Sequence, residues 1–316
     1  IKITYPSSNN KHRRDTASCE RYISNLAEIF KEHGGKGKRE FVDLSLFRFT
    51  YLNLKHERNF MESIASIVHP WLSHEIINRS TESSNKKIPL KRRDPQKPPR
   101  IGFYFDNTNP GHVVFKHYYN IVKSCKASEM EIVLLKGPLA AAQDSKDLEK
   151  QSSQVFQLSN NMENSVRSMK ELSLDVLIYT ETHSSPVPYC LMHNRIAPTQ
   201  MVLPGNEITT GLKTIDYYIS SKYTETSDSD NYYTEKLIKL DGMPCGFDEI
   251  IAPRKEYDRN YFGIPMDWGI VNLMHQAIKF HPDWDNILEQ IAQSCENILF
   301  IISSNKSSDE CKLLRG

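Results

Sequence analysis

The chain has 316 residues, of which 39% are hydrophobic and 25% charged, a composition typical of globular proteins and unlike that of disordered, collagen-like or coiled-coil chains. Its forty Lys and Arg residues are balanced by thirty-nine Asp and Glu residues, so no basic field is present to hold a nucleic-acid backbone. We therefore expect no nucleic acid among its partners. The sequence also has no run of about 18 apolar residues, so it predicts no membrane span.

The six cysteines form no Cys-x-x-Cys pair and no other short spacing typical of zinc or of a disulfide framework. This usage favours a reducing compartment, and we expect a cytoplasmic location.

Residues 1–80 are predicted to form a helical N-terminal region. Tyr22, Leu26 and Ile29 recur at a spacing of three to four before two glycines interrupt the pattern, and a second helix is expected over residues 57–77. Residues 81–99 carry a basic cluster and several prolines but no apolar period, which predicts a linker. Solvated linker charge is preferred here over a localisation signal or a contact with an anionic surface.

From residue 100 onward, short apolar runs alternate with amphipathic segments. Strands are expected at residues 101–105, 131–135, 175–179, 199–203, 215–219 and 236–240, and helices at 114–125 and 162–172. The alternation predicts the α/β class, with a Rossmann-like parallel sheet covered by helices on both faces over residues 100–250.

A second alternating unit starts after residue 250, with strands expected at residues 270–274 and 297–302 and a helix at 284–295. Two parallel strands cannot bury both of their faces. Either these residues pack onto the first sheet, or residues 251–316 are the start of an incomplete second Rossmann-like lobe. We favour the second interpretation, in which the chain is a fragment.

Ligands of open parallel sheets bind beyond the carboxyl ends of the strands, so the loops that follow strands are the candidate sites. Residues 106–112 follow the first strand and precede a helix, where free backbone N–H groups favour an anion. His112 is the group in this loop that titrates near neutral pH. The alternative is a helix-capping turn with an incidental histidine.

Two further loops follow strands. In residues 203–211, the small or polar residues Gly205, Asn206, Thr209 and Thr210 can bring backbone and hydroxyl groups to a ligand, or they can form an ordinary turn. In residues 275–282, Lys279 offers a compact positive charge suited to a phosphate, although a surface lysine before a helix is the simpler interpretation.

Other motifs for common chemistries are weak or missing. Asp228, Ser229 and Asp230 form an acid-x-acid triplet of the kind that can hold a divalent cation, but no strand precedes it, and we interpret it as a solvated loop. The sequence contains no Walker loop, no Gly-x-Gly-x-x-Gly, no Gly-x-Ser-x-Gly and no His-Glu-x-x-His. P-loop phosphoryl transfer, dinucleotide oxidoreduction and the hydrolase and metalloprotease classes therefore lack their signatures.

Three segments, in order, resemble the catalytic region of the O-linked N-acetylglucosamine transferases and of the bacterial N-glucosyltransferases that modify adhesins. The first is the run Ile-Ala-Pro-Thr-Gln-Met-Val at residues 196–202, followed by Gly205, Thr-Thr-Gly at 209–211 and Asp-Tyr at 216–217. The second is Tyr-Thr-Glu-Lys-Leu at residues 233–237, and the third is Gln276-x-x-Lys279.

This resemblance implies a glycosyltransferase-B fold, in which two Rossmann-like lobes hold a UDP-sugar in the cleft between them without a metal or other cofactor. His112 matches the family histidine after the first strand, Lys279 the lysine that steadies the departing diphosphate, and Gln276 its neighbour in the donor site. The resemblance thus assigns His112 and Lys279 as catalytic and Gln276 and Lys279 as donor-binding. The 203–211 loop departs from the family pattern, because Gly205 is followed by Asn206 and Glu207.

The function implied is transfer of a hexose or N-acetylhexosamine from a UDP-sugar to a side chain of an acceptor protein or peptide, with inversion. The family's His-Thr-Thr donor motif is not found in the sequence, and we expect it beyond residue 316. The alternatives are a non-catalytic acceptor-binding or degenerate scaffold module of the same fold, which Asn206 and Glu207 favour, and a nucleotide-sugar epimerase, a class that lacks the motifs above.

Overall fold

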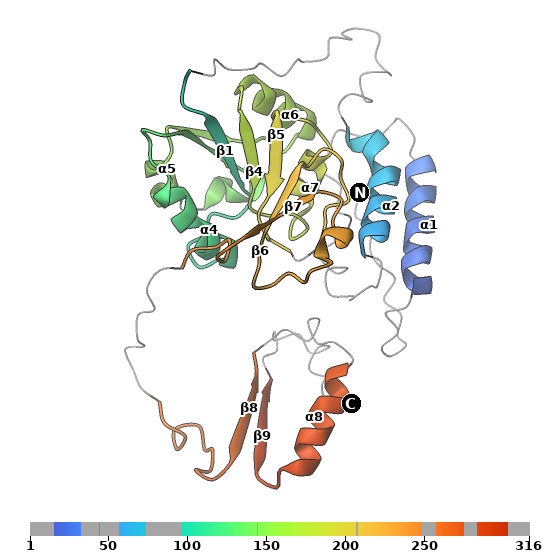
Figure 1. Cartoon of the computed structure of the whole chain (residues 1–316), viewed down its shortest axis with the longest axis vertical. Helices are drawn as coiled ribbons and strands as arrows, with labels where there is room; N and C mark the ends of the chain where they lie inside the picture. The colour runs from blue at the N-terminus through green and yellow to red at the C-terminus, as the bar shows by residue number, and fades with distance from the viewer. Residues whose placement is uncertain are drawn as a thin grey trace. The chain divides into compact units, whose positions relative to one another are not determined.

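A seven-stranded, entirely parallel sheet forms the centre of the larger of two units into which the chain divides (Figure 1). The computed structural model describes residues 16–32, 44, 57–73, 96–143, 145–206, 208–247, 257–274 and 283–302. The described residues up to 247 belong to the first unit and the later ones to the second.

The strands of the sheet run in the order β3-β2-β1-β4-β5-β6-β7, and every neighbouring pair is parallel. Their bounds are β1 (Arg100–Phe105), β2 (Glu131–Lys136), β3 (Gln154–Gln157), β4 (Val176–Tyr179), β5 (Thr199–Val202), β6 (Tyr217–Ser221) and β7 (Lys236–Leu240). The α/β class expected from the alternating pattern is confirmed, and each of the six expected strands is present. The edge strand β3 was not predicted.

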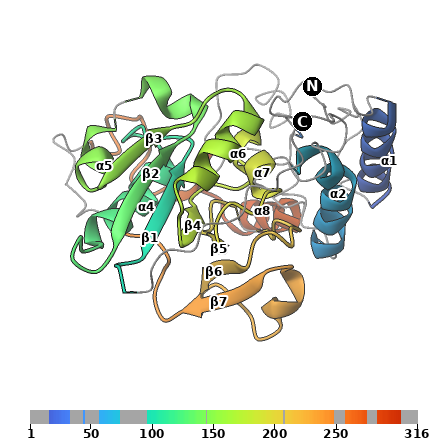
Figure 2. The same cartoon turned by 90° about the horizontal axis from the view of Figure 1, so that it is seen from above.

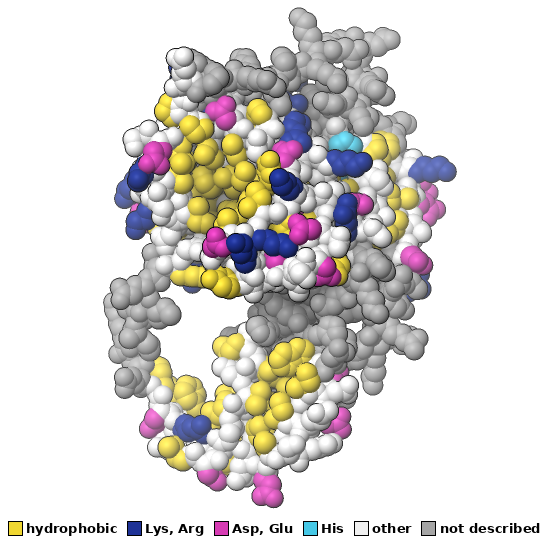
Figure 3. Space-filling model, in the orientation of Figure 1, with side chains coloured by type: hydrophobic (Ala, Val, Ile, Leu, Met, Phe, Trp, Pro, Cys, Tyr) yellow, Lys and Arg dark blue, Asp and Glu magenta, His cyan; other side chains and the backbone are white. Residues whose placement is uncertain are grey.

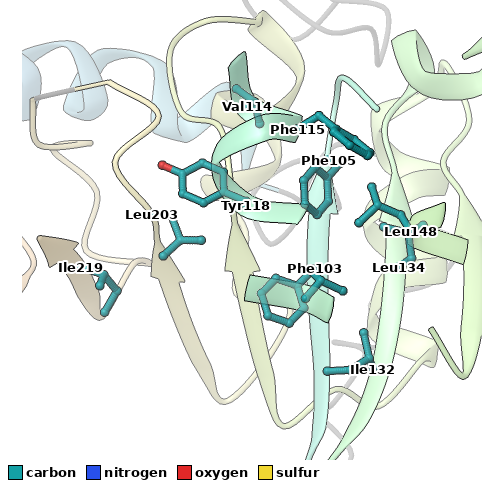
Figure 4. Packing of buried hydrophobic residues seen from close by; sticks show 11 residues of the cluster. Phe103, Phe105, Val114, Phe115, Tyr118, Ile132, Leu134, Leu148, Leu203 and Ile219 are labelled. Atoms are coloured by element: carbon teal, nitrogen blue, oxygen red, sulfur yellow. The ribbon is translucent and has the colours of Figure 1, made fainter. Parts of the chain in front are cut away.

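The sheet forms because its central strands are apolar on both faces, as parallel strands between helices must be. In β1, Phe103 and Phe105 point to one face, where they pack against α4 (Val113–Ser124), as Figure 4 shows. The same cluster takes in Ile132 and Leu134 of β2. Helix α4 presents to this cluster four buried side chains at helical spacing, namely Val114, Phe115, Tyr118 and Val122.

Tyr104, between the two phenylalanines, points to the opposite face, where its ring lies 5.6 Å from that of Tyr179. Helices α6 (Met162–Glu171) and α7 (Pro186–Met192) contact each other and follow strands β3 and β4. Right-handed crossovers place these two helices on the face away from α4 (Figure 2). Three further helical segments that lie between strands of this sheet are short: η2 (Pro138–Ala142), α5 (Lys146–Lys150) and η3 (Ser229–Tyr232).

Two N-terminal helices, α1 (Thr16–Glu32) and α2 (Glu57–Leu72), lie side by side at the edge of the first unit (Figures 1 and 2). Helix α2 is tied to the loops of the sheet, because Thr234 Oγ1 donates to Glu62 Oε1 at 3.0 Å and Asn194 Nδ2 donates to the carbonyl of Leu72 at 3.0 Å. The helical character expected before residue 80 is confirmed where it is described. Residues 74–77 of the second predicted helix, and most of the predicted 81–99 linker, lie outside the described residues.

Gly211 allows this close packing. Its φ of +72° is left-handed, and a Cβ there would lie 2.5 Å from the carbonyl carbon and 2.6 Å from the carbonyl oxygen of Met61. Only glycine fits this approach of a loop to the backbone of a helix.

The second unit consists of β8 (Gly269–Leu273), α8 (Asp283–Ser294) and β9 (Ile298–Ile302). The two strands are parallel, in register from Gly269 with Ile298 to Leu273 with Ile302. These elements agree closely with the predicted ones, whereas the interpretation of this unit as an incomplete lobe stays a prediction.

The surface of the first unit mixes charges of both signs beside apolar side chains (Figure 3). Hydrophobic residues such as Ile178, Met201 and Ile238 pack against the hydrophobic cluster between α4 and the sheet, and they are only partly buried. Lysines near β7 lie beside carboxylates, as in the Lys239–Asp230 pair at 2.9 Å. No helix within the described residues is long and apolar enough to span a membrane.

Candidate functional site at the carboxyl ends of β1, β4 and β5

The order of the strands creates a topological switch point between β1 and β4. From β1 the chain moves outward through β2 to β3, and it then returns to β4 on the other side of β1. The loops after β1 and β4 consequently leave the sheet in opposite directions, which is where open α/β sheets bind their ligands. Residues 106–112 and 180–185 meet at this place.

Glu181 joins these two loops. Its side chain is 2% exposed, and Oε1 accepts hydrogen bonds from the backbone N–H groups of Asp106 at 3.2 Å and Asn107 at 2.9 Å. The other carboxylate oxygen accepts from the hydroxyl of Ser184 at 3.0 Å. Both oxygens of Glu181 are thus used to hold backbone and neighbouring side chain in place.

Asp106 lies beside Glu181 and is fully buried, with its Oδ1 accepting a hydrogen bond from the Tyr104 hydroxyl at 3.1 Å. Burial, reinforced by the charge of Asp106, raises the pKa of Glu181 to about 7, although the hydrogen bonds from Ser184 and the two amides oppose this. Burial also raises the pKa of Asp106. Among the described residues, no Lys or Arg forms an ion pair with either carboxyl group.

Gly205 and Asn206 attach the loop after β5 to the loop after β4. A Cβ on Gly205 would lie 2.9 Å from the carbonyl oxygen of Thr180 and 3.0 Å from Cα of Glu181, so a larger residue would push the two loops apart. Asn206 is 5% exposed. The amide orientation that satisfies both of its groups lets its oxygen accept from the N–H groups of His183 and Ser184, each at 3.3 Å.

His112 caps α4. Its Nδ1 accepts a hydrogen bond from the backbone N–H of Val114 at 3.3 Å, so the neutral ring carries its proton on Nε2. The side chain is half-buried, and this burial lowers the pKa of His112, which keeps the ring neutral at physiological pH. His112 can therefore donate a hydrogen bond from Nε2. The lone pair on Nδ1 already accepts the N–H of Val114 at the start of α4.

Thr209 and Thr210 face the interior. Thr209 Oγ1 donates to Glu235 Oε2 at 2.6 Å, and the N–H of Thr210 donates to Glu235 Oε1 at 2.9 Å. The Thr210 hydroxyl donates to the same oxygen. All three residues are at most 5% exposed, so Glu235 fixes this loop from within.

Several predicted residues lie outside the described residues: Gln276, Lys279 and Glu207. Of the described ones, Gly205 and Asn206 contact the loop after β4, and Glu181 of that loop bonds the start of the loop that ends at His112. Thr209 and Thr210 are instead held by Glu235. In the acid-x-acid triplet, the protein's own donors occupy the carboxylates, because Lys239 bonds Asp230 and the Tyr232 hydroxyl donates to Asp228 at 3.0 Å. In the described part of the chain, no group of three or more His, Cys, Asp or Glu residues could hold a metal ion.

The sequence reasoning missed the loop after β4, which carries Glu181 and His183. His183 is 3% exposed, and neither of its ring nitrogens has a hydrogen-bond partner. Burial lowers the pKa of His183 to about 3, so its ring is neutral. The signal was present, because a polar run follows a buried strand here as it does after β1.

The parallel sheet with this strand order and switch point, followed by a second parallel β-α-β unit, fits the glycosyltransferase-B fold class. The comparisons agree with this class. A mutant O-GlcNAc transferase from Thermobaculum terrenum superimposes with a TM-score of 0.61 at 14% identity, over 94% of this chain and 55% of that one. The chain thus spans about half the length of this structural relative.

In sequence, an alignment 110 residues long shows 28% identity to the probable UDP-N-acetylglucosamine–peptide N-acetylglucosaminyltransferase SEC of Arabidopsis thaliana. It covers 31% of this chain and 11% of that protein. No family model matches the chain. The comparisons therefore give the fold and a distant similarity in sequence.

Proposed function

We propose that this chain is part of a glycosyltransferase that moves a hexose or N-acetylhexosamine from a UDP-sugar to a side chain of an acceptor protein or peptide, with inversion and without a metal. The observation that carries the proposal is the switch point between β1 and β4, in a fold shared with an O-GlcNAc transferase. The loops after these two strands are joined there by hydrogen bonds to Glu181. The cytoplasmic location also stays a prediction.

The proposed reaction breaks the bond between the anomeric carbon and the phosphate oxygen and forms a bond from that carbon to the acceptor atom. UDP leaves with the electron pair, and the acceptor loses its proton. Lys279 is assigned to offset the charge that grows on the departing diphosphate, with Gln276 beside it in donor binding.

His112 is assigned to orient a ligand oxygen by donating its Nε2–H. The role of general base does not suit it, because Nδ1 already accepts the Val114 N–H. Gly205 and Asn206 belong to the loop proposed to lie beside the site, and Thr209 and Thr210 support that loop from within through Glu235.

A binding module without catalysis is the second candidate. Asp106 and Glu181 place two carboxyl groups at the switch point with no paired cation among the described residues, which disfavours a diphosphate close to them. A neutral or cationic acceptor peptide would suit this environment better.

The test is sugar transfer from a radiolabelled UDP-sugar to a peptide pool, with and without chelator, for this chain and for the full-length protein. Transfer that persists in chelator supports the proposal, and transfer that chelator abolishes contradicts the metal-independent mechanism. Peptide binding without transfer by the full-length protein would favour the binding module. Conversion of the UDP-sugar to an epimer without peptide would favour an epimerase.

Within the active protein, Lys279→Ala should lower turnover by about a hundredfold, since a charge on the leaving group loses its partner. Lys236→Ala, which removes an exposed lysine from β7, is the matched control and should leave turnover unchanged. Equal losses in both variants would remove Lys279 from the mechanism.

A further inference from the structure

The first residues of the loop that carries His112 are held by a carboxylate from the loop after β4. Glu181, two residues after β4, accepts the backbone N–H groups of Asp106 and Asn107, the first two residues after β1. Because the side chain is 2% exposed, water does not compete for these bonds. The position of the first residues of the loop therefore depends on Glu181.

A series of hydrogen bonds continues from that point to His112. Asn107 Oδ1 accepts the N–H of Asn109 at 3.0 Å, and Asn109 Oδ1 accepts the N–H of Gly111 at 2.8 Å. The carbonyl of Asn109 accepts the N–H of His112 at 2.8 Å, and His112 then caps α4 through Val114. The bonds thus connect Asn107 to His112 step by step, and Thr108 between them is also held, because its N–H donates to Gln143 Oε1 at 2.6 Å.

We propose that Glu181 is a positioning residue for His112: by holding Asp106 and Asn107 it sets the direction in which His112 presents its Nε2–H to a ligand. The inference rests on the proposed function in one respect, that His112 faces the ligand. The proposed coupling between Glu181 and His112 rests on the hydrogen bonds alone and does not require the proposed function.

The groups that face Glu181 make this coupling depend on its ionisation. Asp106 of the β1 loop raises the pKa of Glu181, and Ser184 of its own loop donates to it. Glu181 in turn contributes to the raised pKa values of Tyr104 of β1 and Tyr118 of α4. Burial raises the pKa values of both tyrosines far above neutral, so Asp106 is the charge that matters. When Glu181 loses its proton, its bonds to the two amides become charge-assisted and therefore stronger.

Protonation can be accommodated without moving the side chain, because the Oε2–H group can then donate to the Ser184 hydroxyl, which reverses that hydrogen bond. Glu181→Gln reproduces this neutral arrangement at every pH. Its amide oxygen accepts the two N–H groups and its amide nitrogen donates to Ser184. Glu181→Ala removes the acceptor altogether.

The experiment is NMR of the chain labelled with ¹⁵N, following backbone amides and the ring nitrogens of His112 against pH. In the wild type, the amides of Asn107, Asn109 and His112 should titrate together with a midpoint of about 7. Glu181→Gln should abolish this shared step, leave only the separate titrations of His112 and Asp106 at lower pH, and keep the neutral His112 ring protonated on Nε2. Glu163→Gln, which alters a buried carboxyl of α6 paired with Arg167, is the control and should leave the titration in place.

Two further variants sharpen the test. Asp106→Asn should lower the midpoint but preserve the titration, because it removes the neighbouring like charge and leaves Glu181 present. Glu181→Ala should accelerate hydrogen exchange at Asn107 by about tenfold or more and mix the two tautomers of His112. The inference is overturned if the loop amides still titrate in Glu181→Gln, or if the His112 ring signals are the same in Glu181→Ala as in the wild type.

These readouts separate the inference from the proposed function. If the full-length protein transfers no sugar, the proposed function fails while the coupled titration stands. If transfer occurs and His112 does not respond to Glu181, the inference alone fails.

Discussion

Glu181→Gln should also stabilise the first unit at alkaline pH. In the folded chain the pKa of Glu181 is about 7, against 4.5 for an ordinary glutamate, because burial and the charge of Asp106 disfavour the ionised form. Between these two values the folded chain keeps a proton that the unfolded chain has released. The free energy of unfolding therefore falls as the pH rises through this window, and the loss is complete above it.

The size of the effect follows from the shift. One pKa unit corresponds to about 1.4 kcal/mol, so the difference between about 7 and 4.5 amounts to about 3 kcal/mol at the alkaline end. Glutamine keeps the hydrogen bonds without the charge. We expect the variant to match the wild type near pH 4.5 and to exceed its stability by about 3 kcal/mol at about pH 8.

Hydrogen exchange of peptides from β1 and β4 measures the free energy of unfolding of the first unit alone. This matters because two units need not unfold together. Glu163→Gln controls for the loss of a buried carboxyl in the same unit. A difference between Glu181→Gln and the wild type that is the same at both ends of the pH range would refute the reasoning. So would a greater stability of the wild type at alkaline pH.

Three other outcomes are expected. Gly211→Ala should destabilise the first unit by about 3 kcal/mol or more in a urea titration and release α2, because it adds a Cβ 2.5 Å from the backbone of Met61 at a φ of +72°. The control is Gly242→Ala, where nothing lies within 4 Å, and its effect in the same titration should be close to zero. Glu235→Ala should cost about 3 kcal/mol, since three buried donors of the 209–210 loop lose their acceptor, and an unchanged urea midpoint would contradict this. His183 has a pKa lowered to about 3, so it contributes stability that is lost as the pH falls below about 6.5. His183→Phe should shift acid unfolding, followed by circular dichroism, to lower pH, and a shift to higher pH would show that the ring has a partner when the protein is folded.

The sheet could be predicted from the sequence because its central strands are short apolar runs between amphipathic helices. The strand β3 was missed because Gln154–Gln157 is four residues long, lies at the edge and is only half-buried on alternate residues. Helix α7 was not predicted; it has only seven residues, and two of them, Pro186 and Pro188, belong to the residue type that disfavours helix interiors. Pro186 is the first residue of this helix, a position that does not require a backbone N–H.

The candidate site could be predicted only in part, for a physical reason. The local pattern predicts a candidate ligand-binding loop after β1. The pairing of β1 with β4, in contrast, depends on contacts 75 residues apart, such as that from Asp106 to Glu181. Likewise, the sequence places Thr209 and Thr210 in a loop but does not reveal that Glu235 anchors them.

The packing of α2 has a consequence for the order in which the protein is made. The backbone of α2 at Met61 meets a loop at Gly211, and Glu62 bonds Thr234, 172 residues further along the chain. At about 5–20 residues per second, a ribosome needs roughly 10 to 30 s to produce that partner after α2 has been synthesised. Throughout that interval the contacts of α2 with the loops of the sheet are incomplete, because Asn194, Gly211 and Thr234 are made one after another. A chaperone that binds nascent chains should therefore meet this protein first at α2, and should release it once β7 has emerged.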